Sequence, residues 1–224
     1  MTYTSPYIAP TLTVDAVIMR LGERGLEVLL HRRPQEPFAG EWALPGGYCA
    51  KGQTTIDALR QVVQRKTGAS LDTGVRHLEQ LYTFDTVARD PRGHAVSVVY
   101  MALGTDIAHN PEQHEAQFWP VTTLPTLAYD HAEIIAMAQR RLAGKVQYTN
   151  IAFSLLPATF TLSELQTAYE AVLGRGLDKR NFRKKILSLD MIHETGDMRR
   201  DGAHRPAKLY AFNQASLVAL AREF

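Results

Sequence analysis

The chain has 224 residues, of which 45% are hydrophobic and 21% are charged, and its 25 basic and 23 acidic side chains give a net charge of +2. This composition is typical of a globular protein and excludes collagen-like, coiled-coil and disordered chains. The sequence shows no secretory signal and no apolar run near the ~20 residues that cross a bilayer, so we expect a cytoplasmic protein that contacts no membrane. The single cysteine, Cys49, agrees with a reducing compartment and excludes an intrachain disulfide.

Strand-like and helical patterns succeed one another over the first part of the chain. Residues 11–20 alternate loosely in apolar character, and residues 26–33 continue as a second strand after a glycine turn. Residues 54–68 carry apolar side chains three to four apart and end on a glycine, which is typical of an amphipathic helix. Two further strands are predicted at residues 77–84 and 95–103.

A helix predicted at residues 131–142, ended by Gly144, places a domain junction near residues 144–150. We therefore divide the chain into a first domain, residues 1–144, and a second domain, residues 145–224. The first carries 13 basic and 15 acidic side chains, a net charge of −2, whereas the second carries 12 and 8, a net charge of +4. The basic excess of the second domain favours an anionic partner such as nucleic acid.

The second domain is predicted to contain three helices and a hairpin. The helices fall at residues 148–156, 161–173 and 179–189, with capping residues at the start of the last two and a glycine after the second. Strands at residues 192–194 and 208–212 flank a polar tip. This order predicts a winged helix-turn-helix.

Residues 46–69, GGYCAKGQTTIDALRQVVQRKTGA, resemble the signature of Nudix hydrolases. In that signature a glycine is followed after five residues by glutamate, and after seven more by Arg-Glu-apolar-any-Glu-Glu-any-Gly-apolar. Its glutamates hold Mg²⁺ against a pyrophosphate. Gly47 and Gly68 occupy the two glycine positions, and Val63 occupies the apolar position between them.

The side chains that hold the metal in the Nudix signature are absent here. Gln53 stands at the first glutamate, Gln61 and Val62 replace the Arg-Glu pair, and Arg65 and Lys66 replace the final pair of glutamates. Mg²⁺ prefers anionic oxygen ligands, and two cations at this place repel it. We therefore expect no catalytic residues, no metal, no cofactor and no pyrophosphatase activity.

The chain as a whole resembles the NrtR group of bacterial Nudix-related transcriptional regulators. The segments that carry this resemblance are residues 29–47, 78–100, 129–135 and 160–187, and the similarity covers residues 10–213. It implies an α+β protein with an N-terminal Nudix-like α/β/α sandwich, built on a mixed sheet, and a C-terminal winged helix. It also implies a homodimeric repressor of NAD metabolism genes that senses ADP-ribose or a related NAD metabolite. Because a symmetric dimer binds two half-sites, we expect a roughly palindromic operator.

Cationic and aromatic side chains in or near residues 46–69, which we call the box, are the candidate ligand-binding residues. Guanidinium and ammonium groups pair with diphosphates, and aromatic rings stack on adenine. Arg65 and Lys66 stand where the metal would lie and are a cationic substitute for it. The residues predicted to contact the ligand are Arg32, Arg33, Trp42, Arg65, Lys66, Tyr82, Arg89 and Arg92. A surface role for the cations and a core role for the aromatic residues remain the alternatives.

The predicted helix at residues 179–189 is the candidate recognition helix. Phe182, Ile186 and Leu189 fall on one face, which leaves cations free to meet phosphates and base edges. The residues predicted to contact DNA are Lys179, Arg180, Asn181, Arg183 and Lys184 in this helix and Arg199, Arg200 and Arg205 in the wing. For Asn181 a role at the helix N-terminus remains the alternative.

Two other functions remain open. Some relatives with eroded Nudix boxes respond to a pentose and control carbohydrate genes, and a neutral sugar does not need Arg65 and Lys66. The second is an ADP-ribose or nucleotide pyrophosphatase that uses replacement metal ligands such as Asp57 or Glu79.

Overall fold

The structure, a computed structural model, describes residues 9–200, 206–221 and 224. Its main sheet has seven strands in the order β3-β2-β1-β6-β5, with β4 paired to β1 and β7 paired to β2. β1 runs parallel to β6 and the other pairings are antiparallel, so the sheet is mixed, as predicted. The strands are β1 (Thr11–Gly22), β2 (Gly25–Arg32), β3 (Trp42–Ala43), β4 (Gly46–Tyr48), β5 (Val75–Phe84), β6 (Ala95–Gly104) and β7 (Ala116–Pro120).

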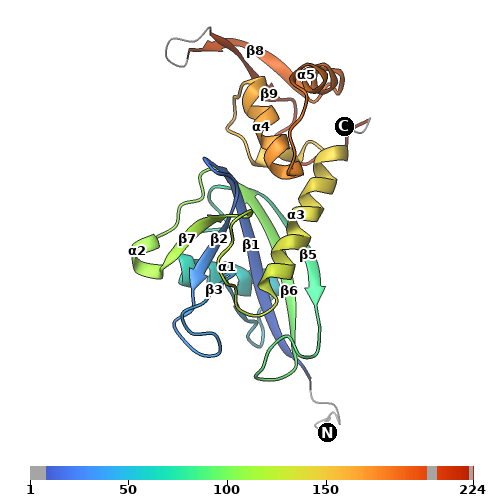
Figure 1. The fold of residues 1–224 in the computed structure, drawn as a ribbon. Coiled ribbons are helices and arrows are strands. Elements are labelled where there is room, and N and C mark those ends of the chain that lie inside the picture. Colours follow the sequence, from blue (N-terminus) through green and yellow to red (C-terminus); the bar gives the residue numbers. More distant parts are fainter. Residues whose placement is uncertain (1–8, 201–205, 222–223) are drawn as a thin grey trace.

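Helices cover both faces of this sheet, and a smaller helical part follows it (Figure 1). The alternation along β1 explains the two layers, because successive side chains of a strand point to opposite faces. Ala16 and Ile18 pack with α1, whereas Val17 and Met19 pack with α3. The predicted α/β/α sandwich is confirmed. The helical elements are α1 (Thr55–Thr67), α2 (Pro111–His114), α3 (His131–Tyr148), the 3-10 helix η1 (Ile151–Ser154), α4 (Leu162–Leu173) and α5 (Lys179–Ser188).

The helix predicted at residues 131–142 was expected to end at Gly144. This is wrong, because α3 continues to Tyr148. Leu142 and Val146 are both fully buried, so the apolar stripe of α3 crosses the glycine without a break. That continued packing offsets the cost of about 1 kcal/mol that a glycine carries inside a helix. α3 therefore extends from the sheet into the second part of the chain. No helix in the described part of the chain combines the length and the apolarity that crossing a membrane requires.

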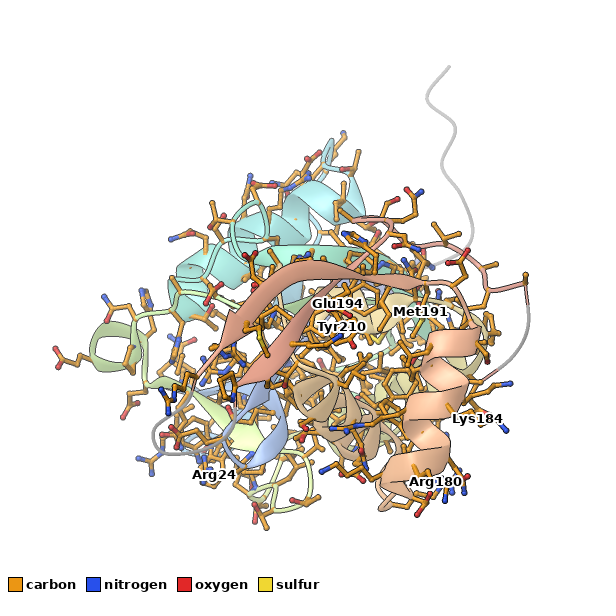
Figure 2. The ribbon with its side chains drawn as sticks, turned by 90° about the horizontal axis from the view of Figure 1, so that it is seen from above. Arg24, Arg180, Lys184, Met191, Glu194 and Tyr210 are labelled. Atoms are coloured by element: carbon orange, nitrogen blue, oxygen red, sulfur yellow. The ribbon has the colours of Figure 1, made fainter. Side chains whose placement is uncertain are left out.

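The second part contains α4, α5 and a hairpin of β8 (Ile192–Arg199) and β9 (Ala207–Phe212). Thr161 forms a capping box with Glu164 at the start of α4, and the Asp178 side chain accepts the backbone N–H of Asn181 at the start of α5. The predicted first helix of this part is only the short η1. Figure 2 shows α5 beside the hairpin, which confirms the winged helix-turn-helix arrangement.

Apolar packing joins the two parts. Side chains of the sheet, α3, η1, α4 and α5 belong to one continuous hydrophobic cluster, and α4 lies against β2. α3 therefore contacts both the sheet and the helices of the second part.

Candidate functional site

A pocket of about 280 Å³ opens at one end of the sheet, where the turns after β2, β3 and β5 meet the C-terminal end of α1 and the start of α3. Its lining includes the acidic residues Asp15, Glu36 and Asp90. It also includes five cationic residues, and we call it the cationic pocket after them: Arg33, Arg65, Lys66, Arg89 and Arg92.

Glycines of the box allow the last turn of α1 and strand β4 to line one side of the cationic pocket. Gly68 ends α1 in the left-handed conformation, with φ of 69°, so Arg65 and Lys66 occupy the last turn of the helix. A Cβ at residue 46 would overlap the carboxylate of Asp15. A Cβ at Gly47 would lie 3.6 Å from Nη2 of Arg65, which places that guanidinium against the glycine turn.

Asp15 lies buried at the base of the cationic pocket. Its Oδ2 accepts a hydrogen bond of 2.5 Å from the hydroxyl of Ser97 and lies 3.8 Å from Nη2 of Arg89. Burial raises the pKa of this carboxyl, and the hydrogen bond from Ser97 and the charge of Arg89 oppose the rise.

Two buried histidines of the pocket lining are neutral. The backbone N–H of Leu44 donates to Nδ1 of His131 at 3.0 Å, so the ring proton lies on Nε2, 3.7 Å from Oδ1 of Asp15. Burial lowers the pKa of His131 to about 3 and that of His31 to about 3. His31 Nδ1 lies 3.2 Å from the carbonyl oxygen of Arg32, and its Nε2 has no hydrogen-bond partner among the described residues. The positive charge of the pocket therefore comes from its lysine and arginines.

The pocket disfavours the charged form of Lys66. Burial lowers its pKa to about 8; Asp15 opposes this, while Arg33 and Arg65 add to it by repulsion. Within the described residues its ammonium makes no hydrogen bond or ion pair. An anion that entered the pocket would supply the partner that Lys66 lacks.

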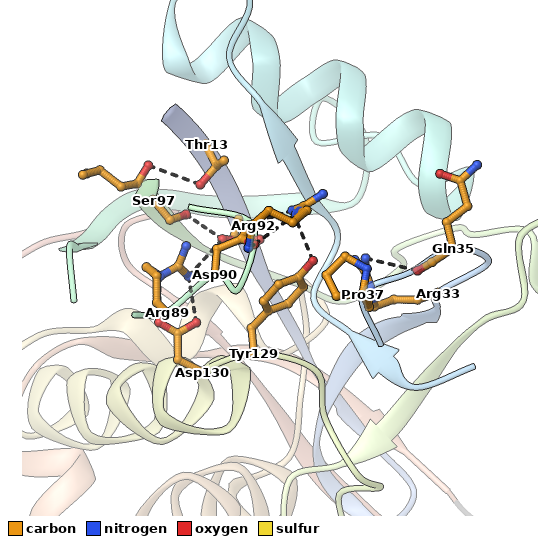
Figure 3. A network of polar contacts seen from close by, with 12 residues as sticks. Thr13, Arg33, Gln35, Pro37, Arg89, Asp90, Arg92, Ser97, Tyr129 and Asp130 are labelled. Atoms are coloured by element: carbon orange, nitrogen blue, oxygen red, sulfur yellow. Dashed lines mark hydrogen bonds and ion pairs between the residues drawn. The ribbon is translucent and has the colours of Figure 1, made fainter. Parts of the chain in front are cut away.

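Two arginines of the turn between β5 and β6 are held by carboxylates (Figure 3). Arg89 donates to both oxygens of Asp130, at 2.8 Å from Nε and 2.7 Å from Nη2. Arg92 donates to both oxygens of Asp90, at 3.0 and 2.7 Å, and the hydrogen bond from Arg92 lowers the pKa of that carboxyl. Nη2 of Arg92 also lies 3.3 Å from the hydroxyl of Tyr129.

The structure brings together five of the eight residues predicted to contact the ligand, namely the five cations of the pocket. Arg32 lies outside it, where its Nε donates to the carbonyl oxygen of Gly40 at 2.9 Å. The rings of Trp42 and Trp119 form a T-shaped pair, and Tyr82 is exposed on β5, where its ring forms a T-shaped pair with that of Phe84. Ligand contact by each of the eight residues stays a prediction.

Sequence reasoning missed several residues of the lining. Tyr48, inside the box, and Tyr129 are the aromatic side chains that line the cationic pocket. Tyr129 has φ of 55°, an uncommon conformation for a residue with a side chain. The sequence did not indicate that His31 and Asp15 line a pocket, because each lies within a predicted strand, where a buried side chain is the ordinary expectation. Tyr129 and His131 belong to a segment that carried the family resemblance, which was the available signal.

The donors at the box do not fit the Mg²⁺ that Nudix hydrolases use. Nε2 of Gln53 donates to Oε1 of Gln61 at 2.9 Å, Val62 is buried, and Arg65 and Lys66 line the pocket. Among the described residues, no group of three or more His, Cys, Asp or Glu side chains is arranged to hold a metal. Mg²⁺ requires several oxygen ligands in near-octahedral geometry. An isopropyl group and two cations supply none, and the amide oxygens of Gln53 and Gln61 already accept hydrogen bonds from Ala50 N–H and from Gln53.

The proposed replacement ligands lie away from the pocket. Asp57 accepts a hydrogen bond of 2.5 Å from the hydroxyl of Thr54 at the start of α1. Glu79 on β5 pairs with Lys145 at 2.6 Å and with His77 at 3.0 Å, and these partners lower its pKa to about 2 against the effect of burial.

The exposed face of α5 carries a second group of cations. Phe182 and Ile186 are buried against α4, while Arg180 and Lys184 are exposed and point outward in Figure 2. Arg183 is half-buried, and its Nη2 lies 3.4 Å from the hydroxyl of Ser163 on α4. The remaining predicted helix residues, Lys179 and Asn181, are also exposed.

The wing residues have different surroundings. Nη2 of Arg199 lies 2.5 Å from Oε1 of Glu164, which ties β8 to the start of α4. Arg200 is exposed. The predicted contact at Arg205 lies outside the described residues.

Family models match both parts of the chain. A model described as the NrtR DNA-binding winged helix domain matches residues 152–212, and a model of the NUDIX domain matches residues 9–138. The chain is 35% identical to a protein of Acinetobacter baylyi named ADPR responsive transcriptional repressor NtrR, over 93% of this chain and 84% of that protein. It is also 35% identical to an ADP-ribose pyrophosphatase of Methanocaldococcus jannaschii, over 58% of this chain and 73% of that protein.

Solved structures show the same two-part architecture. The crystal structure of Shewanella oneidensis NrtR complexed with a 27mer DNA matches with a TM-score of 0.77 at 30% identity, over 95% of this chain and 99% of that chain. The NUDIX domain of Shewanella oneidensis NrtR complexed with ADP ribose matches with a TM-score of 0.52 at 31% identity, over 62% of this chain and 94% of that one.

Replacement of Lys66 by methionine should stabilise the protein. The variant removes a half-buried charge that has no hydrogen-bond partner among the described residues, and it keeps a similar volume, so we expect the free energy of unfolding at pH 7 to rise by about 0.5–2 kcal/mol. Because the pKa of Lys66 is lowered from 10.5 to about 8 in the folded protein, the difference from wild type is largest below about pH 8 and shrinks as the pH rises toward 10.5. Urea denaturation at several pH values measures it. The same change at exposed Lys51 is the control, and a destabilised Lys66→Met would contradict the prediction.

Proposed function

The chain belongs to the NrtR family of Nudix-related transcriptional regulators, and we propose that it is a repressor of NAD metabolism genes that responds to ADP-ribose. The observation that carries the proposal is the replacement of the metal-binding carboxylates by Arg65 and Lys66 in a pocket that three more cations line. ADP-ribose has a diphosphate with two negative charges. Guanidinium and ammonium groups bind such a group without a metal.

The relatives support both halves of this proposal. The Shewanella oneidensis structures hold DNA in one case and ADP-ribose on the NUDIX domain in the other. By analogy, residues 1–144 bind the effector and residues 145–224 bind DNA, with α3 shared between them. A homodimer in the cytoplasm would place two copies of α5 on a palindromic operator.

Repression without catalysis is the second part of the proposal. A Nudix pyrophosphatase needs the glutamates of its signature to hold Mg²⁺. This chain has Gln53, Val62, Arg65 and Lys66 at those positions. The likeness to the pyrophosphatase of Methanocaldococcus jannaschii then reflects a shared fold and a shared ligand rather than a shared reaction.

A pentose effector is the rival that the pocket disfavours. A neutral sugar would leave the ammonium of Lys66 without an anionic partner. The same five cations would then carry a cost in stability without a function.

Effector binding should depend on the charge of Lys66. We expect Lys66→Met to weaken ADP-ribose binding by about tenfold or more, because a charge-assisted contact to phosphate is lost. Wild-type affinity should fall as the pH rises through about 8, where Lys66 loses its proton, and Lys66→Met should lack this dependence. Calorimetric titration at about pH 7 and about pH 9 measures both effects. Tight binding of a free pentose that neither the variant nor the pH alters would support the sugar-sensing alternative.

DNA binding should depend on the exposed cations of α5. The double variant Arg180→Ala with Lys184→Ala should bind operator DNA about tenfold or more weakly, with a salt slope shallower by about 2, because two phosphate contacts are lost. Fluorescence anisotropy with DNA from upstream of the neighbouring genes measures it. Lys51→Ala with Arg140→Ala removes the same two charge types from exposed positions of the first part and is the matched control. Equal affinity of the two double variants would contradict the assignment of α5.

ADP-ribose should survive incubation with this protein and Mg²⁺. No AMP above the buffer level is expected, because the box supplies cations where carboxylates would bind the metal. Chromatography of the nucleotides after incubation measures AMP, and the Methanocaldococcus jannaschii pyrophosphatase provides the positive control. Release of AMP at an enzymatic rate would refute the non-catalytic proposal.

A further inference from the structure

α3 has its two ends in different functional regions. At its start, Tyr129 and His131 line the cationic pocket, and Asp130 between them pairs with the pocket residue Arg89. Its 18 residues span about 27 Å. At the other end, Val146 is fully buried in the cluster that includes α4 and α5. One rigid element therefore connects the proposed effector site with the proposed DNA-binding part.

The start of α3 is anchored by one nearly buried ion pair. The side chains of Arg89 and Asp130 are only 6% and 16% exposed, and two hydrogen bonds of 2.8 and 2.7 Å join them. Figure 3 shows the pair between the turn that carries Arg89 and the start of the helix. Bidentate guanidinium–carboxylate pairs fix direction as well as distance.

Asp130 is an N-cap residue that does not cap its own helix. The side chains of Thr54, Thr161 and Asp178 each accept a backbone N–H at the start of α1, α4 and α5, with ψ of 157°, 158° and 120°. Asp130 stands at the same position of α3 with ψ of 17°, and its side chain makes no capping hydrogen bond. Its carboxylate is committed to Arg89 instead.

The preceding residue is strained as well. Tyr129 has φ of 55°, and a non-glycine residue holds such a conformation only where its surroundings impose it. The hydroxyl of Tyr129 lies 3.3 Å from Nη2 of Arg92, so the neighbouring arginine of the same turn contacts the segment that leads into α3. The backbone before α3 is thus held away from the usual capped geometry by contacts with pocket residues.

We propose that Asp130 is the positioning residue that converts effector binding into movement of α3, an inference that rests on the proposed function. The diphosphate of the effector and the carboxylate of Asp130 compete for the guanidinium of Arg89. When the diphosphate takes Arg89, Asp130 turns to cap the N-terminus of α3, as the other three N-cap residues do in their helices. The accompanying rotation of ψ at Asp130 changes the direction in which the chain enters α3.

This competition gives the effector different affinities for two arrangements, which any ligand-driven switch requires. In the arrangement described here, Arg89 is held by Asp130 and is a poorer ligand for phosphate. In the other, Arg89 is free for phosphate and α3 is capped by its own residue. The effector therefore favours the second arrangement.

The test is the coupling between effector and operator DNA in Asp130→Asn. Asparagine caps helices as well as aspartate does but cannot form the ion pair, so the variant should already adopt the second arrangement. We expect ADP-ribose to bind about three- to tenfold more tightly, because Arg89 no longer has to be released. We expect the ratio of operator dissociation constants with and without ADP-ribose, about 5–150 in typical coupled systems, to fall to within about twofold of one. Anisotropy and calorimetry on the full-length protein measure the two quantities.

Asp72→Asn is the matched control. It also takes a carboxylate from an arginine, because Oδ1 of Asp72 accepts from Nε of Arg60 at 3.1 Å, but neither residue lines the cationic pocket, so the coupling ratio should persist. Arg89→Lys keeps the charge and loses the bidentate geometry, so its coupling ratio should also fall. If Asp130→Asn folds poorly, Arg89→Lys tests the inference in its place.

Three outcomes separate the claims. A wild-type protein that binds no ADP-ribose overturns the proposed function and this inference with it. Wild-type binding together with an unchanged coupling ratio in Asp130→Asn and Arg89→Lys overturns this inference alone. Weaker ADP-ribose binding in Asp130→Asn also overturns it, since that is the result of a merely structural role.

Discussion

Five cationic side chains line the cationic pocket, and the charges of three of them, Arg33, Lys66 and Arg89, act on the buried carboxylate of Asp15. Burial, together with repulsion from Arg33 and Arg65, lowers the pKa of Lys66 to about 8, so the charged form of this lysine costs the fold stability. Hydrophobic packing of α1 and α3 on the sheet offsets that cost. A metal would add to the repulsion, whereas a diphosphate would relieve it, and this difference supports the proposal that the pocket binds an anion without a metal.

Elements whose formation depends on residues close together in the chain could be predicted from the sequence. The glycine spacing of the box placed α1 and its end at Gly68, and the capping residues and the hairpin pattern located the winged helix-turn-helix. The end of α3 could not be placed, because a glycine marks a helix end only when no buried stripe continues beyond it. Here Leu142 and Val146 continue the stripe, and tertiary packing prevailed over the local signal.

The lining of the pocket could be predicted only in part, and the reason is geometric. Cations in or beside the box and in the turn between β5 and β6 face one space because the strands end there. For Trp42, an aromatic residue beside the glycine turn, sequence position could not show that its ring packs on Trp119 of another strand. Tyr129 could not be assigned to the pocket because its left-handed backbone has no sequence signature. The ion pair of Arg89 with Asp130 joins residues 41 positions apart and is visible only in the fold.

The role of Lys66 as a cation in place of a metal is tested most directly by the protons taken up when ADP-ribose binds. Calorimetry with EDTA present, in two buffers of different ionisation enthalpy near pH 8.5, gives both the affinity and the number of protons. Metal-independent binding with uptake of up to about one proton, lost in Lys66→Met, is the predicted result, because the bound diphosphate restores the charge of the lysine. Binding that requires Mg²⁺, or that takes up no proton in the wild type, would contradict it.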